Sequence, residues 1–372
     1  MKLDNSDIIK INEEEEGEGR MEFWKGKRVL ITGHTGFKGS WLAIWLNKLG
    51  AEVFGYAQDP YTDQDNFVLS GIGNKIVDIR ADILDMSKLR DVFNDYRPEI
   101  IFHMAAQPLV RKSYEYPKET YEINVIGTLN ILECIRQYDS AKVGIMITTD
   151  KCYENKEQLY GYRETDRFGG YDPYSSSKAC AEILVSSYRD SYFNQAEYEK
   201  HGKAIASVRA GNVMGGGDWS KDRIVPDCIR ALQSNQAISI RNPHAVRPWE
   251  HVLEPLSGYI LLAEKLFNEP LKYSGGWNFG PETNTFTCVS DIAYKIIKNY
   301  GNGEIIDCSD ENNPHEANLL FLDITKAKLK LGWKPKLSID QTIEMTVEWY
   351  KKYKNVDIHQ LCIQQINQFE NC

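Results

Sequence analysis

The 372-residue sequence lacks the features that mark membrane, secreted and nucleic-acid-binding proteins. It has no uninterrupted stretch approaching the roughly 20 apolar residues of a membrane-spanning helix. Its first residues do not follow the charged-then-apolar order of a signal peptide. Lys and Arg form no basic stripe that could face the phosphates of DNA or RNA. We therefore expect a cytoplasmic protein that binds neither membranes nor nucleic acids.

Cysteine is present but has no metal-binding or paired arrangement. The eight cysteines are scattered, with no CxxC pair and no histidine at the spacing of zinc ligands. We predict reduced thiols and no bound metal. Cys152, which lies beside the active site predicted below, is either a nucleophile or a packing residue. The second interpretation is favoured because a buried free cysteine usually acts as a small hydrophobe.

Acidic residues are concentrated at the N-terminus. Residues 1–20 contain seven acids and three bases, in a chain whose formal net charge is −9. This acidic run repels itself and has little to bury, so we predict a disordered acidic extension over residues 1–20. The whole chain is 42% hydrophobic and can bury a full core, as one large domain or two closely joined ones.

From Lys27 onward, short β-rich runs alternate with helical stretches. The pattern predicts strands at residues 28–32, 52–57, 100–104, 143–149 and 204–209, and helices at residues 124–138 and 175–188. Strands that alternate with helices form a parallel, doubly wound sheet with helices on both faces. We predict an α/β fold with a Rossmann-type domain over residues 21–210.

The alternation breaks after about Gly211. Loops rich in Gly, Trp, Pro and Arg follow, mixed with predicted helices at residues 225–233 and 256–266. We predict that residues 211–372 form mainly a smaller C-terminal substrate-binding domain, with boundaries that interleave with the first domain.

A glycine turn, GHTGFKG, follows the first predicted strand and opens a helix. Glycines in this context let a backbone approach the pyrophosphate of a dinucleotide at a helix N-terminus. The second strand ends at Ala57-Gln58-Asp59, with no clear ribose-binding acid and no Arg to receive a 2′-phosphate, which favours NAD over NADP. We predict cofactor contacts from Gly33, Thr35, Gly36, Phe37, Lys38 and Gly39.

Other cofactor contacts are predicted from strand ends and one helix start. Asp78 and Ile79, taken to follow the third strand, could bracket the adenine, although Asp78 is otherwise a surface acid. Asn124 opens a predicted helix and is either a cap or a cofactor ligand. The segment after the strand at residues 100–104 adds Ala105, Ala106 and Gln107 as cofactor contacts, and Arg111 and Ser113 as residues that touch the sugar.

Asp172-Pro173 is a helix start signal, so Tyr174 and Lys178 fall at positions i and i+4 on one helix face. An ammonium beside a phenol favours the phenolate and lowers a pKa that is otherwise about 10. The pair would then act as a base for a hydroxyl proton while a hydride leaves the same carbon. Without further support a YxxxK pattern is only a solvated helix face.

The glycine turn and the Tyr-Lys pair together resemble the extended short-chain dehydrogenase/reductase family, over roughly residues 27–350. The resemblance implies that Tyr174 and Lys178 lie by the nicotinamide of NAD and that Lys178 also holds its ribose. It further implies that the Thr149 hydroxyl helps to orient the substrate. Family members usually pair through a four-helix interface, which implies a homodimer through residues 124–138 and 175–188.

The strand that ends at Thr149 leads into Asp150 and Lys151 at the edge of the sheet where such folds bind ligands. Removing water across C5 and C6 of a sugar needs a base for the C5 proton and an acid for the C6 hydroxyl. The sugar 4,6-dehydratases of the family carry Thr-Asp-Glu here. Lys in place of Glu resembles the CDP-glucose dehydratase branch, as do the motifs GHTGFKGSW, AAQPLVRKSY, TDKCYEN and RPWEHV. Asp150 would be the acid, and Lys151 either the base or a charge-stabilising group.

A nucleotide-diphosphate sugar needs cations for its two charges, and Arg suits bidentate contact with phosphate. The resemblance places Asn212, Arg223 and Arg247 at the diphosphate, with Asp218 and Trp219 in a loop nearby. His251 is expected to pack rather than to catalyse. We predict a dehydratase that acts on CDP-glucose with NAD. The alternatives are a 4,6-dehydratase for another nucleotide sugar, a 4-epimerase, and a noncatalytic NAD-binding sensor or scaffold.

Overall fold

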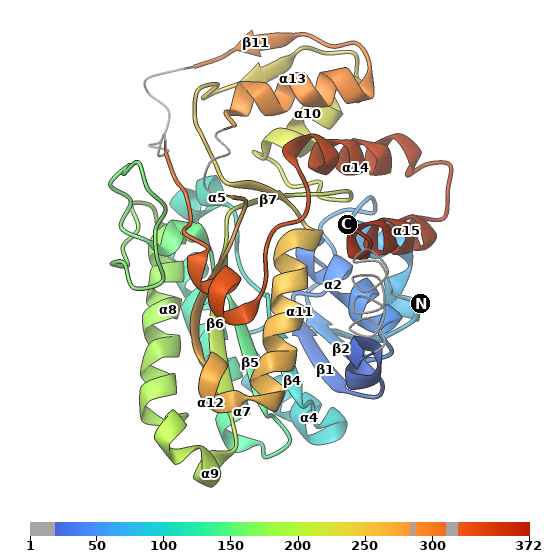
Figure 1. Cartoon of the computed structure of the whole chain (residues 1–372). Helices are drawn as coiled ribbons and strands as arrows, with labels where there is room; N and C mark the ends of the chain where they lie inside the picture. Colours follow the sequence, from blue (N-terminus) through green and yellow to red (C-terminus); the bar gives the residue numbers. More distant parts are fainter. Residues whose placement is uncertain (1–18, 283–286, 310–318) are drawn as a thin grey trace, which may run out of the picture.

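A seven-stranded parallel sheet forms the centre of the computed structural model (Figure 1). The structure describes residues 19–282, 287–309 and 319–372, so the predicted acidic extension lies, up to residue 18, outside the described residues. In spatial order the strands are β10 (Gly275–Phe279), β6 (Ala204–Ala210), β5 (Val143–Ile147), β4 (Ile100–His103), β1 (Arg28–Thr32), β2 (Glu52–Ala57) and β3 (Val77–Arg80). The order reverses between β1 and β4, which confirms the predicted doubly wound, Rossmann-type fold.

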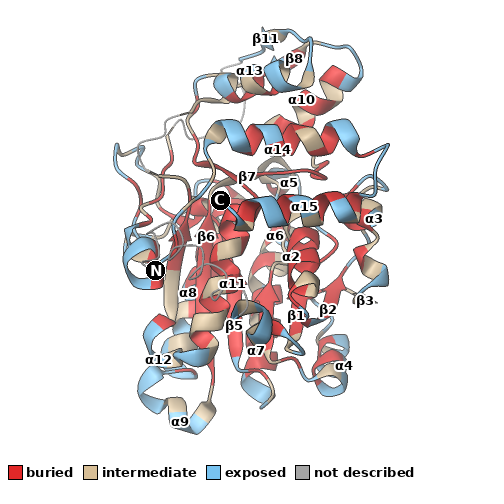
Figure 2. Ribbon diagram, turned by 45° about the vertical axis from the view of Figure 1, so that its right-hand side comes forward, coloured by how far each residue is buried: buried red, intermediate tan, exposed pale blue. Residues whose placement is uncertain are grey.

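Helices cover both faces of this sheet because successive side chains of a strand point to opposite faces. In β1, Val29 and Ile31 belong to the hydrophobic cluster of one face and Leu30 to that of the other. The first face is covered by α2 (Phe37–Lys48) and α11 (Leu253–Asn268); the second is covered by α4 (Met86–Tyr96), α7 (Gly127–Gln137) and α8 (Pro173–Ser191). Figure 2 shows the buried residues concentrated in the strands and on the helix faces against them.

The chain after residue 211 serves two regions. Helix α11 and strand β10 return to the main sheet, where β10 pairs with β6. Much of the rest forms an outer region beyond the carboxyl ends of the strands, at the top of Figure 1. It contains β7 (Asn212–Met214) paired with β9 (Trp249–His251), β8 (Ile238–Ile240) paired with β11 (Ile305–Asp307), α10 (Ile224–Gln233), α13 (Val289–Tyr300) and α14 (Ile339–Lys352).

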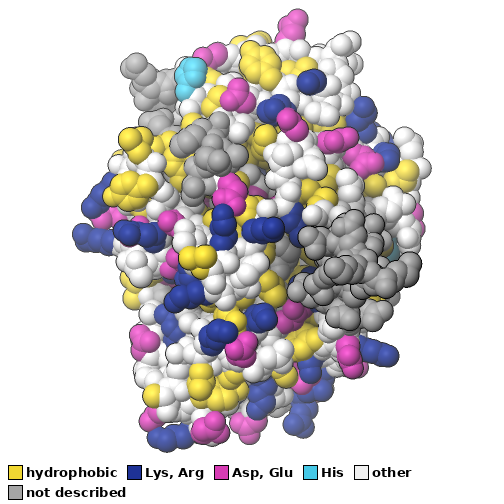
Figure 3. Space-filling view, viewed as in Figure 1, with side chains coloured by type: hydrophobic (Ala, Val, Ile, Leu, Met, Phe, Trp, Pro, Cys, Tyr) yellow, Lys and Arg dark blue, Asp and Glu magenta, His cyan; other side chains and the backbone are white. Residues whose placement is uncertain are grey.

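Shorter helices and the C-terminal helix complete the architecture. The C-terminal α15 (Ile358–Glu370) packs against α2. The short helices are α3 (Asn66–Ser70), α5 (Val110–Glu115), α6 (Pro117–Tyr121), α9 (Tyr198–His201) and α12 (Pro270–Tyr273). On the face drawn in Figure 3, basic and acidic side chains are interspersed. Within the described ranges, no helix is both long and apolar enough to cross a bilayer.

A buried ion pair anchors helix α8 to the sheet. Both Nε and Nη2 of Arg209, on β6, donate to the carboxylate of Glu182, on α8, at 2.8 Å. The two side chains are 3% and 2% exposed. Thr148 and Ser207 also donate to Glu182, so the carboxylate is fully engaged. Because Glu182 lies one helical turn after Lys178, this pair fixes the helix that carries the predicted Tyr-Lys site.

Replacing Glu182 by Gln should destabilise the protein strongly. The substitution leaves the Arg209 guanidinium buried without its counter-ion, which typically costs about 3–5 kcal/mol of unfolding free energy. Urea denaturation followed by circular dichroism measures the loss. The matched control is Glu133→Gln on α7, whose partner Arg136 is at the surface and where about 0–1 kcal/mol is expected. Equal losses in the two variants would contradict a special role for the buried pair.

Candidate active site

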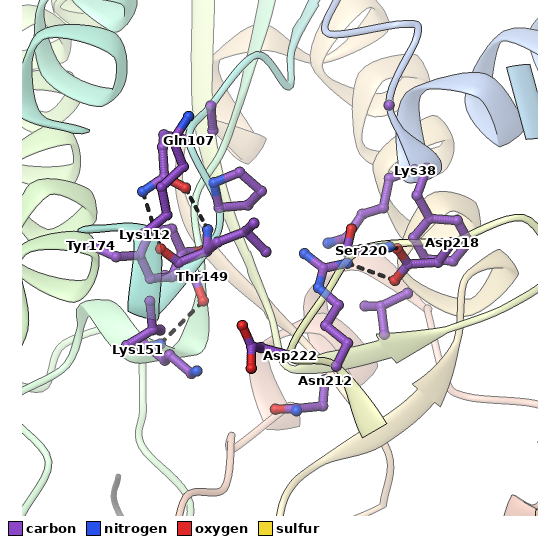
Figure 4. Close-up of a pocket in the computed structure, with 18 of the residues that line it drawn as sticks. Lys38, Gln107, Lys112, Thr149, Lys151, Tyr174, Asn212, Asp218, Ser220 and Asp222 are labelled. Carbon is purple, nitrogen blue, oxygen red and sulfur yellow. Dashed lines mark hydrogen bonds and ion pairs between the residues drawn. The ribbon is translucent and has the colours of Figure 1, made fainter. Parts of the chain in front are cut away.

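A large cavity of about 1610 Å³ opens at the carboxyl ends of the strands, between the main sheet and the outer region. Its wall runs from the end of β2, past the glycine turn and the end of β5, to the loops around α10. Figure 4 shows part of this wall, with Thr149, Lys151 and Tyr174 across the space from Lys38 and Asp218. Nearly all the residues predicted for the site line this one cavity.

The glycine turn is shaped for close approach of an anionic group. Gly33 has φ +76°, and a Cβ there would lie 2.7 Å from the backbone nitrogen of Ala105. A Cβ on Gly39 would lie 2.2 Å from the carbonyl oxygen of Gly33. Helix α2 begins at Phe37 without a side-chain cap. Its first backbone N–H groups are therefore available to bind an anion. The predicted cofactor residues that line the cavity here are Gly33, Thr35, Gly36, Phe37, Lys38 and Gly39.

The predictions at the β3 end need correction. Asp78 and Ile79 lie within β3 rather than after it, and neither lines the cavity. Asp78 instead bonds His34 Nε2 at 2.8 Å and accepts from Arg80 at 2.9 Å. The positions that do line the cavity are Ala81, Asp82 and Ile83. The difference arises because β3 ends at Arg80, a few residues later than the prediction assumed.

The inference that no Arg stands near the end of the second strand was also wrong. Arg80 pairs with Ala57 across the neighbouring strand, so it lies beside Gln58 and Asp59 in space although it is distant in sequence. Its guanidinium is held by Asp78 and lies 3.6 Å from the carboxylate of Asp59. A 2′-phosphate at this edge would therefore meet two carboxylates besides the cation, which is unfavourable for NADP.

Asn124 and Ser113 support the wall rather than line it. Asn124 does not open a helix; it lies inside a π-helical turn, Glu122–Ile126, and is buried. Its amide accepts from the backbone nitrogen of Gln107 at 2.9 Å and donates to the carbonyl oxygen of Gln107. Ser113 is buried and donates to the carbonyl oxygen of Val110. The cavity itself is lined by Ala105, Ala106, Gln107 and Arg111.

Tyr174 and Lys178 lie on one face of α8, as predicted, and both line the cavity. Asp172 caps the helix, because its carboxylate accepts from the backbone nitrogen of Ser175 at 2.9 Å. Lys178 Nζ donates to the carbonyl oxygen of Ile147, on β5, at 3.1 Å, and burial lowers its pKa to about 8. The pair therefore faces the end of β5, which Thr149 follows.

The predicted lowering of the Tyr174 pKa is not found in the structure. Burial raises the pKa of the phenol to about 12, and hydrogen bonding with Thr149 and the charge of Arg223 oppose this rise only in part. A phenolate here needs a further positive charge in the cavity.

Thr149, Asp150 and Lys151 form a tight turn at the end of β5. The Thr149 hydroxyl donates to Asp150 Oδ1 at 2.9 Å and accepts from the backbone nitrogen of Lys151 at 3.3 Å. Asp150 is 1% exposed. Burial raises its pKa, while the charges of Lys151, Arg247 and Lys38 and the hydrogen bond from Thr149 oppose the rise. A raised pKa favours the protonated carboxyl, which is the form that can give a proton to a reacting group.

A buried acid that sequence reasoning missed lies behind this turn. Glu250, on β9, is 2% exposed, and burial raises its pKa well above the usual range. The main opposing charge is Lys38, whose own pKa is lowered by burial and raised by Glu250 and Asp150. The sequence signal that could have indicated Glu250 is an acid between Trp249 and His251, three residues after Arg247.

The far end of the cavity holds arginines and two acids. Arg223 donates to the buried carboxylate of Asp218 at 2.8 Å, and Trp219 packs on the ring of Tyr350. Asn212, Asp218, Trp219, Arg223 and Arg247 all line the cavity, as expected. Asp222 and Arg241, which were not predicted, also line this end and form an ion pair. Asp222 also lies 3.8 Å from the predicted Arg111. This end can neutralise a diphosphate with several guanidinium groups.

The remaining candidates have packing roles. All eight cysteines are free. Cys152 is fully buried, and burial raises its pKa well above the usual range, which disfavours a nucleophilic thiolate. His251 is buried against the ring of Trp41, and its pKa falls to about 3. In the described part of the chain, no group of three or more His, Cys, Asp or Glu side chains is placed to hold a metal.

Comparisons with known proteins agree with this geometry. Residues 30–346 match the family model described as GDP-mannose 4,6 dehydratase. The chain is 51% identical over 331 residues to CDP-glucose 4,6-dehydratase of Salmonella typhimurium, covering 89% of this chain and 92% of that protein. It is 25% identical over 351 residues to dTDP-glucose 4,6-dehydratase 1 of Escherichia coli, covering 87% and 92%. The crystal structure of dTDP-glucose 4,6-dehydratase from Bacillus anthracis in complex with NAD superposes with a TM-score of 0.73 at 21% identity, covering 88% of this chain and 97% of that chain.

Proposed function

The chain belongs to the GDP-mannose 4,6 dehydratase family, and on that premise we propose that it converts CDP-glucose into CDP-4-keto-6-deoxyglucose and water with bound NAD. The observation that carries the proposal is the meeting of Tyr174 and Lys178 with Thr149, Asp150 and Lys151 in one buried cavity. The 51% identity to a CDP-glucose 4,6-dehydratase selects the nucleotide. The same chemistry makes a precursor of deoxysugars.

The residues fit the cofactor. The glycine turn leaves no room for side chains where a pyrophosphate would lie, and the wall continues to Tyr174 and Lys178. Asp59 and Asp78 around Arg80 favour a free ribose 2′-hydroxyl. When bound, NAD would supply a positively charged nicotinamide ring as hydride acceptor for C4 of the sugar and, once reduced, as hydride donor for C6.

Tyr174 is the base of the oxidation step. Its phenolate oxygen, whose formation the positive charge of bound NAD would favour, takes the proton of the C4 hydroxyl. Lys178, whose pKa is lowered to about 8, is placed by the carbonyl oxygen of Ile147 and orients the cofactor ribose. Thr149, which lines the same cavity as Tyr174, orients the hydroxyl that reacts.

Asp150 is the acid of the dehydration step. The keto group at C4 acidifies the C5 proton, and Asp150 gives its proton to the C6 hydroxyl, which leaves as water. Lys151 lies next to Asp150 and lines the cavity, where it either takes the C5 proton or stabilises the charge that develops when another group does so. Arg223 and Arg247 hold the diphosphate at the other end.

A panel of nucleotide hexoses tests the assignment. The protein is incubated with NAD and, separately, CDP-glucose, dTDP-glucose, UDP-glucose and GDP-mannose, and the products are weighed by mass spectrometry. We expect loss of one water from CDP-glucose, with the alkaline ultraviolet absorbance of a keto sugar. Loss of water from another nucleotide hexose alone would reassign the nucleotide, and silence with all four would defeat the proposal.

The same experiment in deuterium oxide separates the nearest alternative. A 4-epimerase inverts C4 without touching C5, so it has no use for a buried acid at Asp150. A dehydratase returns a solvent-exchanged proton to C5, and deuterium at that carbon of the product is expected. A noncatalytic NAD-binding sensor would bind NAD and give no turnover with any sugar.

We also propose that the enzyme works in the cytoplasm as a homodimer that pairs through α7 and α8. Exposed apolar side chains on and next to these helices support the interface: Ile126, Ile183 and Tyr192 are 45%, 57% and 51% exposed. Two copies that cover this face would bury them. Sedimentation of the protein against an Ile183→Lys variant would show whether pairing depends on it.

A further inference from the structure

An acidic side chain stands among the arginines at the far end of the cavity. Asp222 lies in the loop before α10, and its carboxylate forms ion pairs with Arg241, which follows β8, and with Arg111, on α5. The distance from Arg111 Nη1 to Asp222 Oδ1 is 3.8 Å. All three side chains line the cavity, and each is about a third exposed or more. One carboxylate therefore joins a cation of the main-sheet side to a cation of the outer region.

The other two acids described at this end have partners close to them in the chain. Asp218 is 4% exposed and accepts from Arg223, five residues later, at 2.8 Å. Asp227 forms an ion pair with Arg230, three residues later on α10. Of these three acids, only Asp222 contacts arginines from distant segments of the chain. Its position is therefore not explained by the local structure of its own loop.

The backbone holds Asp222 in a conformation that few residue types adopt readily. Its φ of +63° lies in the left-handed region, which Asn, Asp and glycine tolerate best. In the view of Figure 4, Asp222 lies in the open space between Lys151 on one side and Asp218 on the other. The turn thus presents a negative charge in the part of the cavity that has the arginines suited to phosphate.

We propose that Asp222 is a specificity-determining residue, whose carboxylate occupies the anion site until the phosphates of the substrate displace it. The inference rests on the proposed function, which brings a nucleotide diphosphate to this end of the cavity. A diphosphate carries two negative charges, so it repels the carboxylate and offers its own oxygens to the same guanidinium groups. Arg111 and Arg241 then exchange Asp222 for phosphate, and no covalent bond changes.

This exchange selects among anions. The carboxylate is held in place by its own chain, so it competes with any free anion at a high effective concentration. A nucleotide diphosphate also contacts the rest of the cavity through its nucleoside, and these contacts offset the loss of the Asp222 ion pairs. Inorganic phosphate lacks a nucleoside, so the Asp222 carboxylate keeps it from the arginines.

Asp222→Asn tests the proposal. Asn has nearly the same size and also tolerates the left-handed backbone, but it carries no charge that competes for the guanidinium groups. The full-length protein with NAD is titrated with CDP by calorimetry, alone and in the presence of inorganic phosphate. We expect the variant to bind CDP about tenfold more tightly than wild type, and phosphate to displace CDP from it about tenfold more effectively. With CDP-glucose as substrate, its KM should fall by a similar factor, and phosphate should inhibit it competitively.

Two further variants complete the comparison. Asp222→Gly also suits the left-handed backbone and removes the carboxylate, so it should give the same gain as Asp222→Asn. Asp227→Asn removes the same charge from the same end of the cavity, where the side chain is 36% exposed and pairs with Arg230 on its own helix. The affinity of Asp227→Asn for CDP should stay within about twofold of wild type.

Three results would overturn the inference. They are unchanged or weaker CDP binding in both Asp222 variants, tighter CDP binding with no gain for phosphate, and an equal gain in Asp227→Asn, which would trace the effect to net charge alone. Because the binding measurements need no turnover, they decide the role of Asp222 separately from the reaction. A wild type that binds CDP but forms no product from CDP-glucose would defeat the proposed dehydration only.

Discussion

Replacing Tyr174 by Phe should lower turnover by about 10² to 10⁴-fold, because the C4 hydroxyl loses the base that takes its proton. The cycle then stops before the sugar is oxidised, so neither reduced cofactor nor keto sugar should appear. Phe keeps the ring that packs in the cavity wall, and binding of the nucleotide sugar should be nearly unchanged. Stopped-flow absorbance of the reduced nicotinamide, with substrate binding measured by calorimetry, checks both statements.

The control for this variant is Tyr294→Phe. Tyr294 is on α13 in the outer region and is 62% exposed, so loss of its hydroxyl should leave turnover at the wild-type level. Rapid appearance of reduced cofactor in Tyr174→Phe would show that another group takes the C4 proton.

Replacing Asp150 by Asn should also cost about 10² to 10⁴-fold in overall turnover, but it should stop the cycle one step later. Tyr174 and Lys178 are unchanged, so the sugar is still oxidised at C4. The carboxamide has no acidic proton for the C6 hydroxyl, and water cannot leave. Reduced cofactor should therefore accumulate with the enzyme. Its absorbance, together with a mass spectrum that shows no loss of water, measures the effect.

An acid in an exposed loop provides the comparison for Asp150→Asn. Asp63→Asn makes the same carboxyl-to-carboxamide replacement at a position where the side chain is exposed, and both absorbance and product should match wild type. If Asp150→Asn released water at the wild-type rate, the acid of the dehydration step would have to be sought elsewhere, with Glu250 as the next buried carboxyl near the turn.

Local spacing explains what could be predicted of the site. Tyr174 and Lys178 share a helix face because they are four residues apart, and Asp172-Pro173 fixes where that helix begins. The glycine turn is similarly local, since it follows one strand directly and opens one helix. Motif resemblance then brought in Thr149, Asp150 and Lys151, which line the same cavity.

Contacts between distant segments explain what could not be predicted. Arg80 stands beside Asp59 only because β3 pairs with β2, and Asn124 supports Gln107 only because a π-helical turn packs under the strand end. The position of Asp78 was misjudged because periodicity does not fix where a four-residue strand ends.

The sequence by itself determined the doubly wound fold, the dinucleotide turn and the helix with the Tyr-Lys pair, because each depends on periodicity or spacing within one short segment. The tertiary structure alone decided the pKa shifts within the site. Burial raises the pKa of Tyr174, of Asp150 and of Glu250, and it lowers the pKa of Lys38. The loss of solvation that shifts these groups arises only when the outer region closes over the sheet, and no single segment of the chain contains that information.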